Sequence, residues 1–506
     1  MSSPRLAQLR MALARGASIT VAAAIATVLS ACAVGPNYRS PALPQIDEWH
    51  TPPAPGAQPP AANDATLAAW WTVLNDPTLN HLLERAVQDN KSVEQALARV
   101  RESRARRSIS TAGLFPTLDG SAGGRNTDRR SNGGSSVDDL PGLGDNNGFS
   151  SSGESYSAGV DSRWELDLFG GQRRSIEAAS ANLIATEADL RDVLITLLGD
   201  VALSYVNVRT TQARLSFAER NIAAQREVVD IAGWRAEAGL ANALDVEQAR
   251  SSYSQTLAQI PSLQSVLEAS MNRLAVLTGQ TPGALHESLA DRRAIPVAPR
   301  DAVSSVPAEV LRRRPDIRSA ERRLAAQTAQ VGVATAAMYP SLTLTGSFGL
   351  SSGTASDLFS SGLETTGYGI GLNVPIFRAG ALRQQVNAQN ALVEQALATY
   401  ESTVLAALEE TENALTEWAN EQRRREALLQ AATSARLARE LALVQYNSGL
   451  VDFQTVLTAD RQLISTEDAL AVSDGELTSN LIRLYKAFGG GWSVFPASST
   501  SAAGAP

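Results

Sequence analysis

The sequence has few of the residues on which most catalytic and metal-binding sites depend. It contains 506 residues but only one cysteine and three histidines. The histidines, His50, His81 and His286, lie far apart, and no cysteine or carboxylate stands near them at the spacing of a metal site. The sequence also has no glycine-rich phosphate loop and no nucleophile-elbow motif. These absences argue against an enzyme and against a bound metal or cofactor.

The chain also has fewer basic residues than acidic ones. The chain has 44 lysines and arginines against 52 aspartates and glutamates, a net charge of −8. Removal of residues 1–31 would take away three arginines and no acid, leaving 41 basic residues against 52 acidic ones. An acidic chain without a basic patch is not expected to bind nucleic acid.

Long hydrophobic runs are confined to the N-terminus. Arg5, Arg10 and Arg15 are interspersed before an apolar segment at 19–29, which predicts an export signal over residues 1–31. The tetrad Leu29-Ser30-Ala31-Cys32 resembles a bacterial lipobox, so we expect Cys32 to carry lipid. Ala33 follows in place of an aspartate, which in lipoproteins of the enteric type suggests sorting to the outer membrane. No later run of about 18 apolar residues predicts a transmembrane helix. A membrane-spanning part would therefore have to be a closed β-barrel.

Two pairs of segments alternate between apolar and small polar residues, the pattern of a strand with two different faces. The pairs are 114–124 with 155–169, and 340–350 with 366–377. Each segment has roughly the length of a tilted strand that crosses a bilayer. The predicted lipid-facing side chains of the second pair are Leu342, Leu344, Phe348, Ile370 and Leu372. A water-soluble sheet would explain the local alternation equally well.

Each strand pair is followed by a proline-free helical stretch of about 67 residues, roughly 100 Å of helix. These stretches break at Gly239 and Gly449, where a tight turn favours glycine. Return helices complete two long hairpins, 172–277 and 381–488. Pro261 is expected to kink the first return helix.

The order of elements occurs twice. Phe115-Pro116 corresponds to Tyr339-Pro340, and Glu237-Ala238-Gly239-Leu240 corresponds to Asn447-Ser448-Gly449-Leu450. We therefore expect an internal repeat. The predicted organisation is a signal (1–31), a proline-rich lipid-anchored tether (32–64), a first repeat (65–308), a second repeat (309–488) and a disordered tail (489–506). Loops are expected at 125–154 and in the connector 278–308.

Several motifs resemble those of the outer membrane efflux proteins, the TolC-type factors, and in particular their NodT-like lipoprotein branch. The run from Arg312-Arg313-Arg314-Pro315-Asp316-Ile317 to Tyr339-Pro340-Ser341-Leu342 carries most of the resemblance. Trp70-Trp71, Trp164-Glu165-Leu166-Asp167-Leu168-Phe169-Gly170 and Asn373-Val374-Pro375-Ile376-Phe377 agree with it. The similarity extends over about residues 34–490.

The resemblance implies a mainly α protein with a membrane β-barrel portion. Three protomers, each giving four strands, would form one 12-stranded barrel, continued by a long periplasmic α-helical barrel. Such a homotrimer would lie in outer-membrane lipid. It would serve as the exit channel of a tripartite efflux pump, joined through a periplasmic adaptor to an inner-membrane transporter of the resistance-nodulation-division (RND) type. Its cargo would be drugs or other small toxic solutes.

The resemblance also implies that the two helix turns form a periplasmic gate. The residues concerned are Gly239, Leu240, Asp245, Tyr446, Gly449, Asp452, Thr455 and Thr458. Asp245 falls where the family links neighbouring protomers. Thr455 and Thr458 stand where the family prototype has two ring-forming aspartates, for which Asp452 or Asp460 could substitute.

Two alternatives to an efflux channel remain at this point. One is an outer-membrane duct for type I protein secretion. The other is a scaffold that spans the periplasm without a pore.

Overall fold

The computed structural model describes residues 33–42, 49–50, 68–129, 151–297 and 313–491. The predicted signal, Cys32, most of the tether and most of the predicted tail lie outside these residues. The chain divides into two compact units. Unit 1 contains the described parts of 1–39, 103–183 and 323–397, and unit 2 those of 40–102, 184–322 and 398–506. Each unit takes segments from both sequence repeats, so a repeat is not a separate compact body.

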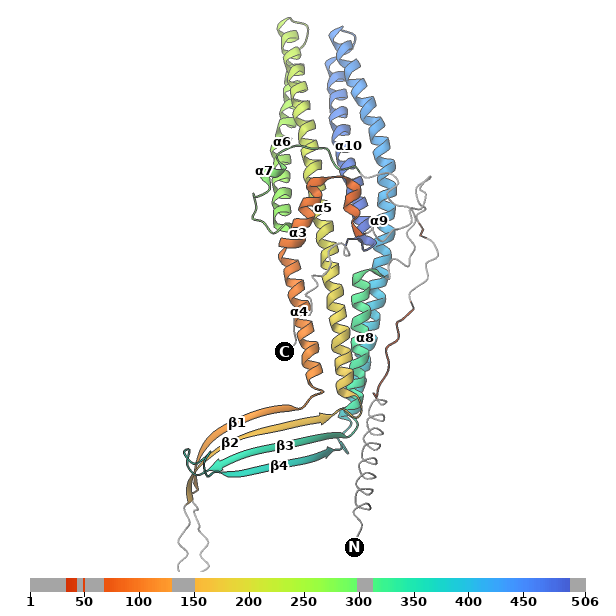
Figure 1. The fold of residues 1–506 in the computed structure, drawn as a ribbon. Helices are drawn as coiled ribbons and strands as arrows, with labels where there is room; N and C mark the ends of the chain where they lie inside the picture. Colours follow the sequence, from red (N-terminus) through yellow and green to blue (C-terminus); the bar gives the residue numbers. More distant parts are fainter. Residues whose placement is uncertain (1–32, 43–48, 51–67, 130–150, 298–312, 492–506) are drawn as a thin grey trace, which may run out of the picture. The chain divides into compact units, whose positions relative to one another are not determined.

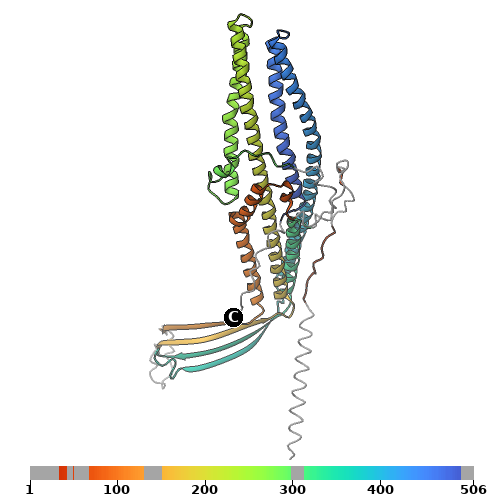
Figure 2. The same ribbon diagram turned by 45° about the horizontal axis from the view of Figure 1, so that its top comes forward.

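Unit 1 contains a four-stranded antiparallel sheet. Its strands are β1 (Thr117–Arg129), β2 (Ser151–Leu166), β3 (Ser341–Ser352) and β4 (Leu363–Asn373). They lie side by side in the order β1-β2-β3-β4, as both views show (Figure 1, Figure 2). Within the described chain, β1 and β4 each pair on one side alone, so each leaves a row of backbone groups that another strand could satisfy.

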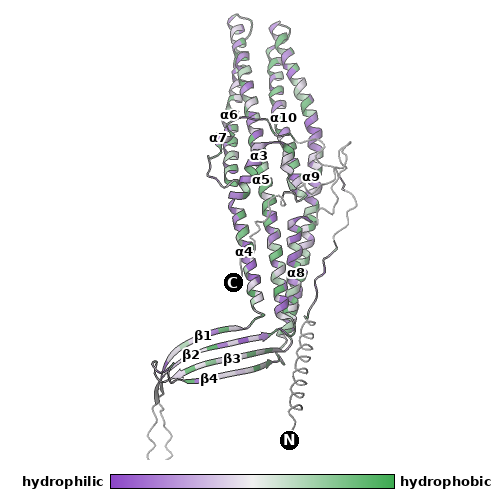
Figure 3. Cartoon of the chain, in the orientation of Figure 1, coloured by the Kyte–Doolittle hydropathy of each residue, from purple (hydrophilic) through white to green (hydrophobic). Residues whose placement is uncertain are grey.

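The register gives the whole sheet one apolar face and one polar face. Leu344 lies opposite Trp164 on one side and opposite Ile370 on the other. The next residue, Thr345, lies opposite Arg163 and Gly369. Directly opposed residues share a face, so the alternation predicted within single strands extends across the sheet (Figure 3).

Several side chains on the apolar face have no cover within the protomer. Phe348 is 45% exposed, Ile370 75% and Leu372 65%. Leu342 and Leu344 are half-buried on the same face. A contiguous exposed apolar surface of this kind requires lipid or another chain to cover it.

The strands differ from the predicted segments at their ends. Residues 125–129 and 151–154, expected in a loop, continue the ladder between β1 and β2, with Arg125 opposite Ser155. Small polar residues still supply backbone donors and acceptors, so the hairpin continues through them. At the other end β4 stops at Asn373, ahead of Pro375, which cannot donate a ladder hydrogen bond. Val374 and Ile376 therefore lie beyond the strand.

The four longest helices pair into two hairpins. The first consists of α5 (Gly171–Glu237) and α6 (Ala243–Leu277), and the second of α9 (Ala381–Asn447) and α10 (Phe453–Ala487). Both long helices have 67 residues, as the proline-free stretches predict. α6 runs as one helix through Pro261. In unit 2 the four helices lie side by side up to their two turns (Figure 1).

Shorter elements complete the helical part. They are η1 (Trp70–Leu74), α3 (Pro77–Asp89), α4 (Lys91–Ala112), α7 (His286–Leu289) and α8 (Pro315–Ala336). α7 lies in the segment expected to be an irregular connector, so that expectation is wrong for these four residues. In unit 2, Trp70 stacks on Tyr485 with ring centroids 5.7 Å apart, which attaches η1 to α10.

The two motifs that carry most of the resemblance have structural roles. The buried Arg314 donates to the carbonyl of Ala487, 2.6 Å away, and to the Glu410 carboxylate, 2.7 Å away. It thereby ties the start of α8 to the end of α10 and to α9. Asp167 accepts from the backbone N–H groups of Gln172 and Arg173, which caps the start of α5.

By length and composition, one helix among the described residues could cross a membrane. An 18-residue window of α5 has a mean hydropathy of 1.3, and 67% of it is buried inside the protein. Burial by protein is what a core helix shows, so the test alone does not make α5 a membrane span.

Candidate gate at the helix turns

The two helix turns in unit 2 have the same backbone construction. Gly239 and Gly449 both have φ of +72°, the left-handed conformation that ends a helix. The N–H of Leu240 donates to the Arg235 carbonyl at 2.7 Å, and that of Leu450 donates to the Gln445 carbonyl at 2.9 Å. The internal repeat therefore extends to individual hydrogen bonds.

The helices that follow the turns begin with acidic caps. Asn242 and Asp245 form a capping box, with the N–H of Asp245 2.9 Å from the Asn242 Oδ1 atom. Asp452 Oδ1 accepts from the Thr455 N–H at 3.0 Å and from its hydroxyl at 2.6 Å. The Thr455 hydroxyl bond holds the pKa of Asp452 below its ordinary value. Thus Asp452 and Thr455, both predicted gate residues, are one local unit.

An apolar cluster, here called the tip cluster, joins the two hairpins below their turns. Its buried members are Val228, Ala232, Ala249, Ala442, Tyr446, Phe453, Val456 and Leu457. They come from α5, α6, α9 and α10. Because all four helices contribute, separating the hairpins at this level would expose apolar surface to water.

Tyr446 is the polar member of the tip cluster. Its ring lies 5.4 Å from that of Phe453, and the Arg235 guanidinium lies 4.4 Å above the Tyr446 ring. Arg235 also donates to the Tyr446 backbone carbonyl at 3.0 Å. Burial raises the pKa of the Tyr446 hydroxyl, which has no hydrogen-bond partner among the described residues. The structure therefore places Arg235, which the sequence reasoning missed, beside a predicted gate residue.

A second contact between the hairpins, here called the polar node, is centred on Asp460. Its Oδ1 atom lies 2.9 Å from Arg439 Nε of α9, and its Oδ2 atom lies 2.9 Å from Gln225 Nε2 of α5. Gln225 also donates to the Ser252 hydroxyl of α6 at 3.3 Å. Asp460 is 5% exposed. Within the protomer the Asp460 carboxylate is therefore engaged between helices, and its substitution for a ring-forming aspartate stays a prediction.

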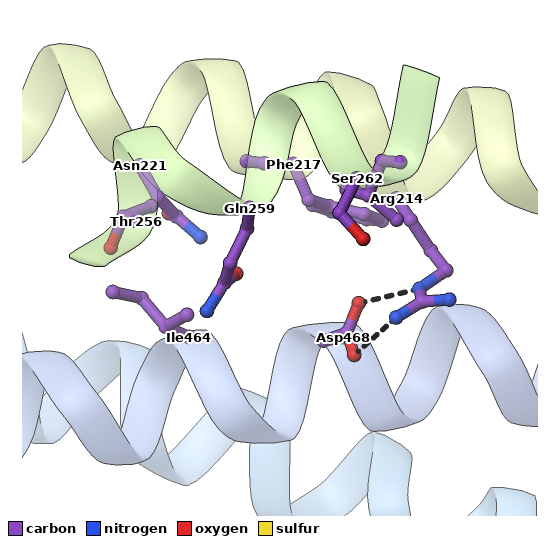
Figure 4. Close-up of a pocket in the computed structure, with 10 residues that line it drawn as sticks. Arg214, Phe217, Asn221, Thr256, Gln259, Ser262, Ile464 and Asp468 are labelled. Atoms are coloured by element: carbon purple, nitrogen blue, oxygen red, sulfur yellow. Dashed lines mark hydrogen bonds and ion pairs between the residues drawn. The ribbon is translucent and has the colours of Figure 1, made fainter. Parts of the chain in front are cut away.

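A third contact closes one side of a cavity of about 220 Å³ (Figure 4). Arg214 of α5 forms a two-pronged ion pair with Asp468 of α10, with N···O distances of 2.7 and 3.1 Å. Phe217, Gln259 and Ile464 line the same cavity. Arg214, Gln225 and Arg235 follow one another at intervals of 11 and 10 residues along α5, about three turns apart. Polar residues recur in this way on many long helices, so the spacing does not single out these contacts in the sequence.

The remaining predicted gate residues make local contacts. The Thr458 hydroxyl donates to the Gln454 carbonyl at 2.8 Å. Leu240 is 70% exposed at its turn, as is Leu450 at 76% in the other turn. No group of three or more metal-ligating side chains occurs in the part of the chain that the structure describes. His286 pairs with the Glu268 carboxylate, which raises the pKa of the imidazole.

The left-handed glycines give a first testable prediction. Gly449→Ala should destabilise the protein by about 1 kcal/mol, because a Cβ is strained at positive φ although nothing else occupies the space. Gly233→Ala is the matched control, since it too adds a Cβ to open space but lies inside helix α5. There alanine should be stabilising, by about 0.5 kcal/mol or more. Unfolding midpoints of the purified variants measure both effects, and equal midpoints would contradict this role of Gly449.

The cap of α10 gives a second prediction, on pH. Because the pKa of folded Asp452 is lowered, its stabilisation is present above the unfolded pKa and is lost as the pH falls through the folded value. The midpoint difference between the wild type and Asp452→Asn should therefore persist at neutral pH, begin to shrink near the ordinary pKa of 3.8 and vanish only below the lower folded pKa. A difference that stays unchanged in acid would show that the carboxylate charge is not responsible.

Comparison with known proteins identifies the family. The family model of the outer membrane efflux protein matches residues 82–280 and 306–490. The chain belongs to the outer membrane efflux protein family. The solvent efflux pump outer membrane protein SrpC of Pseudomonas putida is 33% identical over 469 residues, which cover 92% of this chain and 97% of SrpC. Nodulation protein T of Rhizobium leguminosarum bv. trifolii is 32% identical, with coverage of 92% and 96%.

Structural comparison agrees with this family. A solved structure of the outer-membrane channel OprN matches with a TM-score of 0.80 and 34% identity, covering 91% of this chain and 100% of the OprN chain. The predicted family and fold class are confirmed: the protein is a mainly helical efflux protein of the NodT kind. It has the fold of the trimeric outer-membrane channels, in which helices form the larger part and the four-stranded sheet the membrane part.

Membership in the outer membrane efflux protein family also decides the general function. The protein is an outer-membrane exit channel of an efflux pump, a transport role. Strands β1 to β4 are then this protomer's part of the barrel wall. One face of this sheet is apolar and exposed, as the outward face of a transmembrane β-barrel is.

Proposed function

We propose that this efflux protein forms a homotrimer that receives small toxic solutes from an inner-membrane RND-type transporter through a periplasmic adaptor. One observation carries most of the proposal: a sheet with an uncovered apolar face occurs in the same chain as two matched long helical hairpins. The sheet suits a membrane, and helices of about 100 Å suit a duct that extends far beyond one. Both edges of the sheet are open, which favours closure by other protomers.

The name of one relative supports organic solvents as cargo. SrpC is described as part of a solvent efflux pump, and it matches this chain over nearly its whole length. Nodulation protein T and the channel OprN match over similar lengths. None of these three names describes a protein-secretion duct, which favours small solutes over the type I alternative.

We assign the periplasmic gate to the two helix turns and the contacts below them. The tip cluster, the Arg235–Tyr446 contact and the polar node together hold the first hairpin against the second. Opening by relative movement of the hairpins must exchange these contacts. Thr455 and Thr458 carry no charge, so an aspartate ring at their positions is not part of this proposal.

The N-terminal part of the proposal is a lipid anchor. Residues 1–31 serve as a lipoprotein signal, Cys32 carries the lipid, and residues 32–64 form the tether that leads to the first repeat (65–308) and the second (309–488). Radioactive palmitate should label the wild type but not Cys32→Ser, and globomycin should block processing of the wild type. Labelling of Cys32→Ser would refute the anchor.

Gene deletion tests the transport proposal. A deletion strain should grow less well than its parent in the presence of toluene-like solvents and amphiphilic drugs, and a plasmid copy should restore growth. The control plasmid carries a Leu344→Arg variant, which should be absent from the outer membrane. Unchanged susceptibility to solvents, drugs and metal salts alike would contradict an efflux role.

A further inference from the structure

The residues that immediately follow Cys32 are held at the junction between strand β2 and helix α5, inside unit 1. The N–H of Val34 donates to the Phe169 carbonyl at 3.1 Å. Arg174, in the first turn of α5, donates to the carbonyls of Val34 and Gly35 at 3.2 and 3.3 Å and to Asn37 Oδ1 at 2.7 Å. Three of its hydrogen bonds thus go to a segment about 140 positions away in sequence.

The Arg174 side chain is buried against residues 34–37 and has little contact with solvent. It is 6% exposed, and its guanidinium also pairs with Glu177 at 2.8 Å, one turn further along α5. A buried guanidinium is stable only with its donors satisfied, so the backbone of residues 34–37 is part of its environment. Loss of that segment would leave a buried charge short of partners.

Two glycines allow the N-terminal segment to lie close to helix α8. Gly35 has φ of +92°, and a Cβ at this position would lie 2.5 Å from the Cα of Gly332 in α8. A Cβ on Gly332 would lie 2.8 Å from the Arg174 side chain. Tyr38 then packs against Ala181, Ala325 and Ala326. The segment is therefore seated between α5 and α8 by shape as well as by hydrogen bonds.

We propose that Arg174 is a positioning residue that fixes the height of the lipid anchor relative to the barrel. Val34 is two residues from Cys32, so the two Cα atoms can be at most about 7.6 Å apart. Phe169, which bonds Val34, lies three residues beyond the end of β2, and Arg174 lies eight residues beyond it, where the membrane sheet gives way to helix. The lipidated residue is thereby tied to the rim of the barrel through the clamped residues 34–38. This inference rests on the proposed lipidation of Cys32.

Limited trypsin digestion of outer membranes tests whether the clamp holds the segment. Arg39 provides a cleavage site directly after it. Arg174→Gln should accelerate cleavage at Arg39 by about tenfold or more, and Arg174→Lys should fall between, because lysine keeps the charge but not the planar set of donors. Arg173→Gln is the matched control, since Arg173 pairs with Asp167. Equal cleavage in Arg174→Gln and Arg173→Gln would overturn the clamp.

Insertion variants test the anchor-height role without altering Arg174. Six Gly/Ser residues placed between Ala33 and Val34 lengthen the connection from the lipid to the clamp. The same insert between Pro41 and Ala42 lies beyond the clamp. The first insert should lower the yield of outer-membrane trimer by about threefold or more, and the second should not, because only the first releases the anchor from its fixed height. Equal yields would overturn the role.

Combination with Cys32→Ala separates this inference from the lipidation on which it rests. In that background the first insert and Arg174→Gln should cause no further loss of trimer, since no anchor remains to be positioned. An equal loss in both backgrounds would show that Arg174 is merely structural. Absence of palmitate on the wild type would refute the anchor itself, and the trypsin result would still report whether the segment is clamped.

Discussion

Replacement of Asp460 by alanine is expected to shift the channel toward its open state and to lower its stability. The substitution removes the one carboxylate that contacts both Gln225 of the first hairpin and Arg439 of the second. Removal of one partner from a buried ion pair costs about 3–5 kcal/mol. Of this free energy, the share that favours the closed state comes from the Asp460–Gln225 hydrogen bond, which joins the two hairpins. A hydrogen bond to a charged group contributes about 1.5–3 kcal/mol. The ratio of closed to open channels should therefore fall by about 10- to 100-fold.

A second variant separates gating from stability. Gln225→Leu removes the contact between the hairpins and leaves the Asp460–Arg439 pair, which lies within the second hairpin. It should raise the mean conductance of purified trimer in planar bilayers with a smaller loss of thermal stability than Asp460→Ala. Asp230→Ala, at an exposed acid of α5, is the control for loss of a charge. Wild-type conductance in both Asp460→Ala and Gln225→Leu would contradict the node as a gate contact.

Leu344→Arg is expected to prevent assembly of the barrel. Leu344 lies on the apolar face between Trp164 and Ile370, and an arginine facing lipid costs about 2–4 kcal/mol near the middle of the bilayer. Three protomers carry the substitution, so the trimer would lose up to roughly 12 kcal/mol at the midplane and less toward the interfaces. The amount of trimer in outer-membrane fractions, read from unheated gels, should fall by about tenfold or more.

The neighbouring residue supplies the control for this substitution. Thr343 lies on the polar face, opposite Glu165 and Gly371. Thr343→Arg introduces the same side chain one position away, beside an acid and pointing to the other side of the sheet. It should assemble normally and change conductance or ion selectivity. Equal assembly of the two variants would mean that the apolar face does not contact lipid.

Periodicity and the repeat predicted the fold because those signals are local. A proline-free run ended by Gly239 or Gly449 predicts a long helix and its turn from backbone preferences alone. The alternation in 340–350 predicted which side chains share a face, and the register then extended that face across strands. Strand ends were predicted less well, since polar residues such as Asn126 and Thr127 join a ladder whenever a partner strand continues.

The contacts between hairpins could not be derived from one sequence. Arg235, Gln225 and Asp460 each look like an ordinary polar residue on a long helix. What gives them a role is the approach of another helix from far away in the chain, as with Gln225 and Asp460, 235 positions apart. The resemblance supplied Tyr446 and Asp452, but not the arginine that stacks on Tyr446. Tertiary proximity decides which polar residues matter.

Electrical recording of the purified, detergent-extracted trimer in a planar bilayer is the most direct test of the central claim that this protein is a gated channel. The wild type should show discrete conductance steps, and Asp460→Ala should show larger or more frequent ones. Preparations that are demonstrably trimeric and membrane-inserted, yet show no conductance in either form, would contradict that claim.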